Sequence, residues 1–299
     1  MMDINFKKIV FEDKELISSY IKKQSSRSCS LSFANIYLWE PHYKVTFAVV
    51  EDMLVFKSKG ENPSFSFPIG GADVKKAMDA TMDYCKENGL EYKMYGVTEQ
   101  QFQVIEELYP DEFQIEYDRD EANYVYETEK LINLSGKKYH GKKNHINKFK
   151  KMNDNWQYED ITDENLEEAI EMAYGWRTEN DCDTNELKSI EFCVALNALK
   201  KLKELNLTGG LIRAQGKVVA ITVGEALTDD TYVIHIEKAY ADVDGAYPMI
   251  NREFLEHHGA EYTYVNREED TGAEGLRKAK LSYRPVFMVE IGRVTRKKK

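Results

Sequence analysis

The sequence lacks any apolar run close to the roughly 18 residues needed to cross a bilayer, and residues 218–223 are among its longest apolar stretches. Its first ten residues, MMDINFKKIV, hold no extended apolar segment of the kind found in signal peptides. The four cysteines never occur in C-x-x-C spacing, which argues against a zinc site and against a disulfide framework. We therefore expect a cytoplasmic protein with no integral membrane segment and no metal site.

Net positive charge is concentrated in one short segment. The net charge is −11, and residues 1–125 and 152–299 carry −8 and −9, whereas seven lysines stand between Gly136 and Lys151. A nonspecific nucleic-acid binder needs a positive field over a whole face, so this acidic chain argues against that class of protein. A local phosphate site within the basic segment stays open.

The basic segment contains the string GKKYHGKK, which is close to the phosphate-binding loop G-x-x-x-x-G-K-[ST] of nucleotide hydrolases. That loop needs a hydroxyl after its lysine to reach Mg²⁺, and it follows a buried strand. Here Lys143 takes the hydroxyl position and would repel the metal ion. A phosphate-binding loop of this type is therefore not expected.

The composition and patterning predict two domains of the α+β class. At 299 residues, with 42% hydrophobic and 12% aromatic residues, the chain can fill two cores. The strings NGLEYKMY (88–95) and HGAEYTYV (258–265) share Gly-x-Glu-Tyr between a predicted helix and a predicted strand. We expect related halves with strand–helix–strand units at 64–95 and 231–266. The expected division is an N-terminal domain over 1–125, a connecting strand and basic helix over 126–151, and a C-terminal domain over 152–299 that ends with a strand at 286–293.

Four blocks of sequence carry a resemblance to a known family. They are CSLSFANIYLW (29–39), GKKNHINKFKK (141–151), HIEKAYADVDGAYPMIN (235–251) and NREEDTGAEGLRKAKLSYRP (266–285). With them the chain resembles a bacterial family related to the cytosolic catalytic region of phosphatidylglycerol lysyltransferases and, more distantly, to Fem-type aminoacyl transferases. The resemblance implies two tandem GNAT-like domains, that is, the acyl-CoA N-acyltransferase fold, with the active cleft mainly in the second domain.

The resemblance also bears on the donor substrate. Acetyltransferases of this fold bind the cofactor pyrophosphate with a Q/R-x-x-G-x-G/A loop at a helix N-terminus. The corresponding loop here, Asp242–Tyr247, has one glycine and two acidic residues, which would repel an anion. The family relatives use aminoacyl-tRNA, so we expect that donor first and acyl-CoA second. No cofactor is firmly indicated.

The candidate catalytic residues fit direct attack on an acyl group, because no Ser-His-Asp or Cys-His pattern stands out. Glu237 and Lys238 end an apolar strand, and side-chain alternation points one of the two toward the cleft. Glu237 is the candidate base and Lys238 a candidate substrate-binding residue, although a solvated strand end would explain both. Asn266 ends the strand at which a cleft of this fold would open, and Tyr283 could donate a proton to a leaving group.

Further cations are candidate substrate-binding residues. Arg277 and Lys280 are three residues apart on a predicted short helix, so they share one face, and Arg267 precedes them in the same block. Such cations can hold a phosphate or a carboxylate, whereas the alternative is a surface cluster of salt bridges. Arg177 follows a tryptophan at the end of a predicted helix and could line the acceptor pocket.

The basic segment itself has the periodicity of an amphipathic helix. Lys142 and Lys143 stand near its start, where free N–H groups and the helix dipole favour anions, so they are the candidate phosphate-binding residues. The alternative is a connecting helix with a solvated lysine face. The implied partners are tRNA and, by peripheral contact, an anionic membrane surface.

These observations support an acyl- or aminoacyl-transferase with a phosphate-bearing donor. The second hypothesis is a non-catalytic GNAT-like module that binds an anionic ligand or nucleic acid. The sequence leaves the donor, the acceptor and the oligomeric state open.

Overall fold

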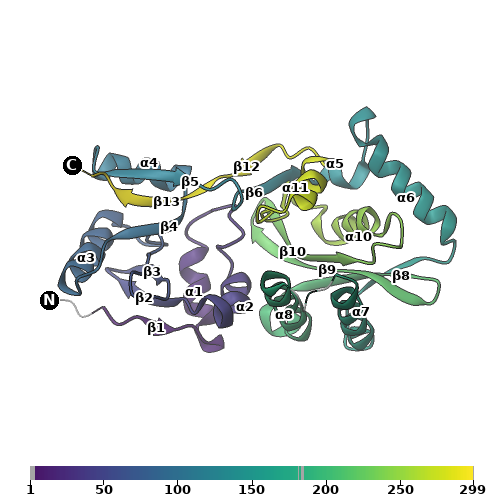
Figure 1. The fold of residues 1–299 in the computed structure, drawn as a ribbon, viewed down its shortest axis with the longest axis horizontal. Coiled ribbons are helices and arrows are strands. Elements are labelled where there is room, and N and C mark those ends of the chain that lie inside the picture. Colours follow the sequence, from purple (N-terminus) through teal and green to yellow (C-terminus); the bar gives the residue numbers. More distant parts are fainter. Residues whose placement is uncertain (1–3, 181, 183–184, 299) are drawn as a thin grey trace. The chain divides into compact units, whose positions relative to one another are not determined.

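The computed structural model describes residues 4–180, 182 and 185–298 (Figure 1). The chain forms two compact units, each assembled from separate stretches of sequence. Unit 1 comprises Met1–Asn123, Glu269–Glu274 and Met288–Lys299, and unit 2 comprises Tyr124–Glu268 and Gly275–Phe287.

These bounds differ from the expected division at the C-terminus. The last strand, β13 (Ile291–Arg296), pairs between β4 and β5 and belongs to unit 1, not to the C-terminal unit. The sequence led us to expect one strand over 286–293, whereas the structure has two short strands there, β12 (Phe287–Val289) and β13, in different sheets. A local pattern carries no information about which strands it pairs with. The basic helix, which we expected as a connection, is an integral part of unit 2.

Unit 1 is built from two three-stranded sheets with the orders β1-β2-β3 and β4-β13-β5. A tight turn at Glu51 and Asp52, both with positive φ, joins β2 to β3 as the sequence predicted. Phe65 pairs in parallel with Met94 of β4, and α3 connects the two, which is the expected strand–helix–strand unit. The elements of unit 1 are β1 (Lys7–Lys8), α1 (Lys14–Ile21), α2 (Phe33–Tyr43), β2 (Thr46–Val50), β3 (Met53–Lys57), α3 (Val74–Glu87), β4 (Lys93–Thr98), α4 (Glu99–Leu108), β5 (Phe113–Tyr117) and β13.

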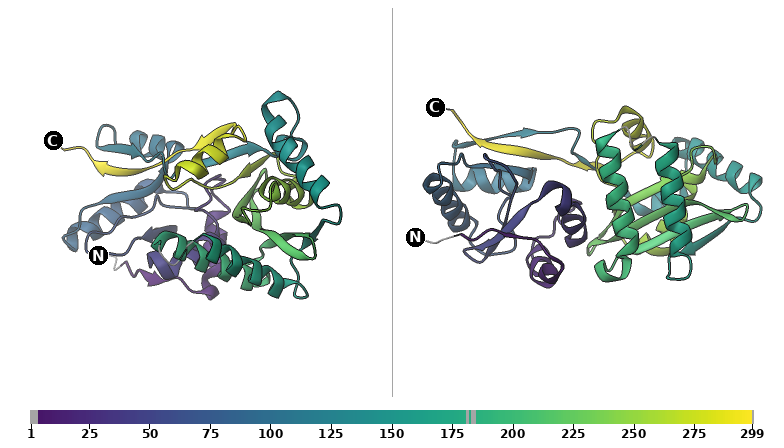
Figure 2. Two further views of the ribbon diagram at one scale, coloured as in Figure 1. Left: turned by 45° about the vertical axis from the view of Figure 1, so that its right-hand side comes forward. Right: turned by 60° about the horizontal axis from the view of Figure 1, so that its bottom comes forward.

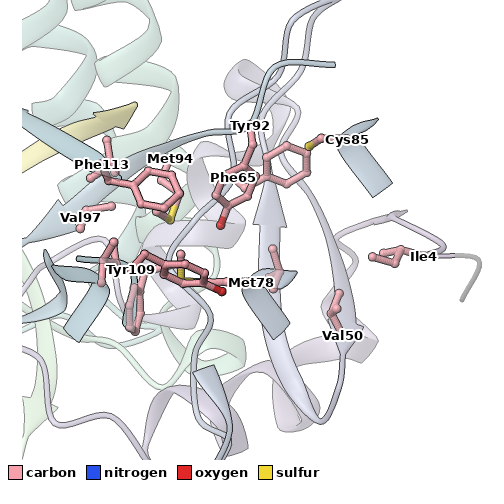
Figure 3. Packing of buried hydrophobic residues seen from close by; sticks show 14 of the residues in the cluster. Ile4, Val50, Phe65, Met78, Cys85, Tyr92, Met94, Val97, Tyr109 and Phe113 are labelled. Atoms are coloured by element: carbon pink, nitrogen blue, oxygen red, sulfur yellow. The ribbon is translucent and has the colours of Figure 1, made fainter. Parts of the chain in front are cut away.

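The core of unit 1 is apolar and aromatic. Figure 3 shows Phe65, Tyr92 and Phe113 packed with Met78 and Met94, and each of these side chains is buried. Helix α3 contributes the buried face that its periodicity predicted, and its first turn is capped by Asp73, which accepts a hydrogen bond from the Lys76 backbone N–H.

Unit 2 is built on a seven-stranded sheet with the order β12-β6-β11-β10-β9-β8-β7. Strands β10 and β11 are parallel, and α10 connects them, which is the second expected strand–helix–strand unit. The elements are β6 (Asn123–Glu127), α5 (Thr128–Asn133), α6 (His140–Met152), β7 (Gln157–Asp160), α7 (Leu166–Glu179), α8 (Glu186–Lys200), α9 (Leu202–Leu205), β8 (Thr208–Ala214), β9 (Lys217–Thr228), β10 (Thr231–Ala239), α10 (Ala246–Phe254), β11 (Tyr264–Asn266), α11 (Glu274–Leu281) and β12 (Phe287–Val289).

Helices cover both faces of this sheet. Figure 2 shows α7 and α8 side by side on one face, and α10 packs on β8, β9 and β10 from the other. Helix α6 packs along α10. No helix among the described residues is both long enough and apolar enough to cross a membrane.

Candidate active site

The candidate site lies where the parallel strands β10 and β11 part. Their pairing ends at Val233 and Asn266, whereas β10 continues to Ala239 with a register shift between Ile234 and Ile236. In sheets of this kind, ligands bind beyond the carboxyl ends of parallel strands. The side chains that follow the last paired residues are therefore the ones placed to do chemistry.

A buried ion pair joins the two strands at this point. Arg267 donates from Nη2 to Oε1 of Glu237 at 2.7 Å, and Asn251 of α10 donates from Nδ2 to Oε2 at 2.8 Å. The side chains of Glu237 and Arg267 are only 12% and 10% exposed. Burial alone would lower the pKa of Arg267, but the charge of Glu237 outweighs it and holds the pKa above its usual value. Arg267 therefore keeps its charge, and the two hydrogen bonds fix the orientation of the Glu237 side chain.

Tyr283 lies against this pair. Its ring is 4% exposed, and the guanidinium carbon of Arg267 lies 4.6 Å from the ring centroid. The ammonium of Lys142 lies 4.1 Å from the same centroid, so two cations contact one aromatic ring. Burial raises the pKa of Tyr283 well above its usual value, so the phenol keeps its proton at neutral pH.

Lys142 lies near the start of α6, and its side chain is partly buried. Burial, together with the charge of Arg267, lowers its pKa to about 8, while Glu237 opposes the shift. The neighbouring Lys143 is exposed. The structure thus separates the two candidate phosphate-binding lysines, and only Lys142 lies at the ring of Tyr283.

Lys280 is buried, so it does not belong to the surface cluster of salt bridges that the sequence left open as an alternative. Its Nζ donates to the Arg267 carbonyl oxygen at 2.6 Å, and the Tyr126 hydroxyl donates to the Lys280 carbonyl oxygen at 2.8 Å. Arg277 lies on the same helix and is half-buried. Helical spacing predicted the shared face, but it could not show that α11 turns Lys280 inward onto the end of β11. Lys280 therefore supports the backbone of Arg267.

Lys238 and Arg177 belong to a different cluster. Because side chains alternate along β10, Lys238 points to the face covered by α7 and α8, away from Glu237. Lys238 pairs with Glu191, and its ammonium lies 4.0 Å from the Trp176 ring centroid. Arg177 lies over the Phe192 ring at 4.9 Å. Neither cation is brought to the Glu237–Arg267 pair by the contacts described.

Asn266 is buried and shapes the backbone at the end of β11. Its Oδ1 accepts a hydrogen bond from the Glu268 backbone N–H at 2.7 Å, across a turn in which Glu268 has a positive φ of 55°. A carboxamide that holds such a turn fixes where the preceding and following residues point. The contact described for Asn266 is thus a positioning contact at Arg267.

Two polar residues of this region were missed by the sequence analysis. Asn251 orients Glu237, and His235 lies between Glu268, 2.8 Å from its Nδ1, and Glu225, 3.0 Å from its Nε2. Burial would lower the pKa of His235, but its two carboxylate partners raise it to about 10. Both residues interrupt otherwise buried apolar patterns, His235 in β10 and Asn251 in α10, and this interruption was the available signal.

The loop before α10 packs on the basic helix. Asp244 accepts hydrogen bonds from His145 at 2.8 Å and from Lys148 at 2.6 Å. A Cβ on Gly245, whose φ is 84°, would collide with the His145 carbonyl oxygen, so the backbones approach closely there. The basic segment is therefore partly neutralised, and its Lys150 also pairs with Glu253 at 3.7 Å.

Comparisons with known proteins agree with this architecture. The family model described as "Phosphatidylglycerol lysyltransferase, C-terminal" matches residues 22–290. An uncharacterized protein of Mycoplasmoides gallisepticum is 26% identical over 177 residues. The match covers 56% of this chain and 54% of that relative, so the chain spans about half the length of the curated relative.

Solved structures are similar over almost the entire chain. A conserved protein of unknown function from Bacteroides thetaiotaomicron is 37% identical, with a TM-score of 0.93, covering 99% of this chain and 100% of that one. L-PGS from Bacillus licheniformis is 13% identical, with a TM-score of 0.67, covering 96% of this chain and 93% of that one. A tandem GNAT protein from the clavulanic acid biosynthesis pathway is 5% identical, with a TM-score of 0.51 and 98% coverage of both chains. The latter two likenesses show the fold alone, and they confirm the predicted tandem GNAT-like architecture.

Proposed function

The chain belongs to the family of the phosphatidylglycerol lysyltransferase C-terminal region, and from this premise we propose that it transfers an aminoacyl group from aminoacyl-tRNA to a lipid hydroxyl. The observation that carries the proposal is the buried Glu237–Arg267 pair with Tyr283 against it, at the carboxyl ends of two parallel strands. Transfer from an ester needs a proton acceptor for the attacking group, a proton donor for the leaving oxygen and positive charge for the tetrahedral intermediate.

The three side chains match these needs. The Glu237 carboxylate keeps acceptor sites beyond its two hydrogen bonds, so it can orient the attacking hydroxyl and take its proton. The acceptor oxygen then bonds to the acyl carbon, and the ester bond to the ribose oxygen breaks. Tyr283, which keeps its proton, donates it to that departing oxygen, and the proton on Glu237 returns to Tyr283 through water. Arg267 stabilises the negative charge that develops.

The loop that opens α10 supports the choice of donor. In GNAT acetyltransferases, this position binds the cofactor pyrophosphate, but here Asp244 and the contact of Gly245 with α6 fill it. A pyrophosphate at this position would have to break both hydrogen bonds of Asp244, and the Asp244 carboxylate would repel it. Aminoacyl-tRNA makes no such demand, which favours it over acyl-CoA. The proposed partners are tRNA and the anionic surface of a membrane that holds the lipid acceptor.

The test is a transfer assay with the purified full chain. Radiolabelled lysyl-tRNA is mixed with vesicles containing phosphatidylglycerol, and labelled lipid is extracted and counted, with acyl-CoA donors in parallel. Glu237→Gln should lower the rate at least about 100-fold and Tyr283→Phe about 10- to 100-fold. Glu274→Gln, an exposed change on α11, is the matched control and should leave the rate unchanged.

A second candidate function has its own support. The exposed cations of the basic segment and the paired Asp244 loop also fit a non-catalytic module that binds an anionic ligand. Binding of tRNA without transfer from any donor, together with unchanged binding in Glu237→Gln, would favour that module over the enzyme.

A further inference from the structure

More cations than carboxylates lie around the ring of Tyr283. Arg267 and Lys142 both contact the ring. Among the described residues, one carboxylate, Glu237, forms an ion pair with either of them, and it pairs with Arg267. Lys280 adds a third cation nearby, but its Nζ is engaged by the Arg267 carbonyl oxygen. A buried excess of positive charge is costly unless an anion compensates it.

Arg267 has an unused donor at this point. Within the part of the chain that the structure describes, its Nη1 is buried and has no hydrogen-bond partner, although Nη2 is bound to Glu237. Buried guanidinium donors are normally all satisfied, because an unpaired one costs free energy comparable to a lost charged hydrogen bond. The orphaned Nη1 points to a ligand that completes the fork of Arg267.

Lys142 has the features of a second ligand contact. Over the described ranges, no carboxylate lies within ion-pair distance of its ammonium, and its side chain lies on Tyr283 although its neighbours on α6 are exposed. It stands in the first turn of a 13-residue helix that has no side-chain cap, so the free N–H groups add to the attraction for an anion.

We propose that Lys142 and Arg267 form an anion subsite at Tyr283 that takes a phosphodiester group of a substrate. The phosphate would accept from Nη1 of Arg267 and from the Lys142 ammonium, which leaves the ring on its flexible four-carbon stem. The substrate identity rests on the proposed function, because a phosphodiester occurs both in the lipid headgroup and in the 3′ end of tRNA. Anion binding itself rests only on the geometry of these side chains.

The experiment measures the reactivity of Lys142 in the full chain without any aminoacyl donor. Each lysine is acetylated with a limiting reagent across pH 6.5–10, and the rate at each site is quantified by mass spectrometry. Lys142 should titrate near pH 8 in chloride. In inorganic phosphate or dimethyl phosphate at equal ionic strength, its apparent pKa should rise by about one unit and its rate at pH 8 should fall several-fold. Lys143 in the same sample is the internal control and should change little.

Two variants and two natural fragments complete the test. Arg267→Lys removes the guanidinium fork but keeps the charge, and it should abolish the protection of Lys142. If this variant fails to fold, phosphate binding to Lys142→Gln is followed by ³¹P NMR instead. Lys143→Gln is the control for that experiment. Glycerophosphoglycerol and the trinucleotide CCA separate the lipid and tRNA sources, and protection by either supports the subsite. Equal protection in chloride and in phosphodiesters overturns it. Transfer activity with no anion protection would refute the subsite alone, and protection without transfer would refute the proposed function alone.

Discussion

Units 1 and 2 share a GNAT-like strand–helix–strand unit but use buried charge differently. In unit 1, buried carboxylates accept from the local backbone and pair only with partly exposed cations: Asp13 accepts from the Val10 N–H and pairs with Lys7, and Asp270 accepts from the Gly272 N–H and pairs with Arg119. In unit 2, buried charges on adjacent strands and helices bind each other, as Glu237 and Arg267 do.

This difference is the reason why the chemistry is proposed for unit 2. A capping carboxylate stabilises the element that carries it and needs no second charge. A buried pair between strands gives little net stability, because desolvation offsets most of the attraction, so stability alone does not explain it. The strand–helix–strand unit is common to both units, and the chemistry is proposed for unit 2, where the buried charges are not explained by local structure.

The largest predicted effect is on the strand-bridging pair. Glu237→Gln and Arg267→Gln should each lower the free energy of unfolding of unit 2 by about 3–5 kcal/mol, because each leaves its partner buried and uncompensated. The double variant should lose less than the sum of the two. Urea unfolding followed by Trp156 and Trp176 fluorescence, in a Trp39→Phe background, reports on unit 2.

The Lys7–Asp13 ion pair in unit 1 serves as the comparison. Lys7→Met removes an ion pair with Asp13, but Lys7 is half exposed, so the loss should stay below about 1 kcal/mol. Additive losses at Glu237 and Arg267, or an equally large loss at Lys7, would contradict the distinction between the units.

The next effect is a pH dependence due to His235. Its pKa in the folded protein is about 10, above the unfolded value of 6.5, so its stabilisation is complete below pH 6.5 and is lost as the pH rises through 10. Between pH 7 and 10, the free energy of unfolding should fall by an amount on the order of 3 kcal/mol. Urea midpoints at several pH values measure this slope.

His235→Gln is the reference for that slope. Lys142, whose pKa is lowered, changes stability in the opposite direction over the same range, so the His235 contribution is the difference between the wild type and this variant. If both proteins show the same slope, the charged state of His235 between Glu225 and Glu268 is wrong.

A smaller effect is predicted for Lys280. Lys280→Met keeps the stem but removes the hydrogen bond to the Arg267 carbonyl oxygen, and it should cost about 1–3 kcal/mol by thermal or urea unfolding. Lys278→Met, an exposed change on the same helix, should stay within about 0.5 kcal/mol. Equal stability of the two variants would contradict the structural role of this hydrogen bond and would favour the surface cluster that the sequence left open as an alternative.

The sequence pattern predicted those elements whose formation depends on neighbouring residues alone. The helix over α3 and the turn at Glu51 and Asp52 follow from periodicity and turn chemistry. The pairing of β13 in unit 1 could not be predicted, because strand partners more than 170 residues away leave no local signature.

The candidate site was predicted as a set of residues but not as an arrangement. Arg267 contacts both Glu237 and Tyr283 in the structure, whereas Lys238 points to the opposite face and Lys280 turns inward. Which side of a strand or helix faces a neighbour depends on packing between elements that are distant in sequence, and a single sequence does not encode that contact explicitly.

The smallest predicted effect is at a helix cap in unit 1. The Thr98 hydroxyl accepts from the Gln101 N–H at 3.3 Å, and Gln101 Oε1 accepts from the Thr98 N–H at 2.9 Å, a reciprocal cap at the start of α4. Thr98→Ala should lower the stability of unit 1 by about 1 kcal/mol, and Thr98→Ser, which keeps the acceptor, should restore most of it. Because this cap serves only local structure, lipid aminoacylation at a temperature well below unfolding should not change. A large loss of transfer in Thr98→Ala, with the fold intact by circular dichroism, would show that unit 1 takes part in the reaction and would end the division of roles between the units.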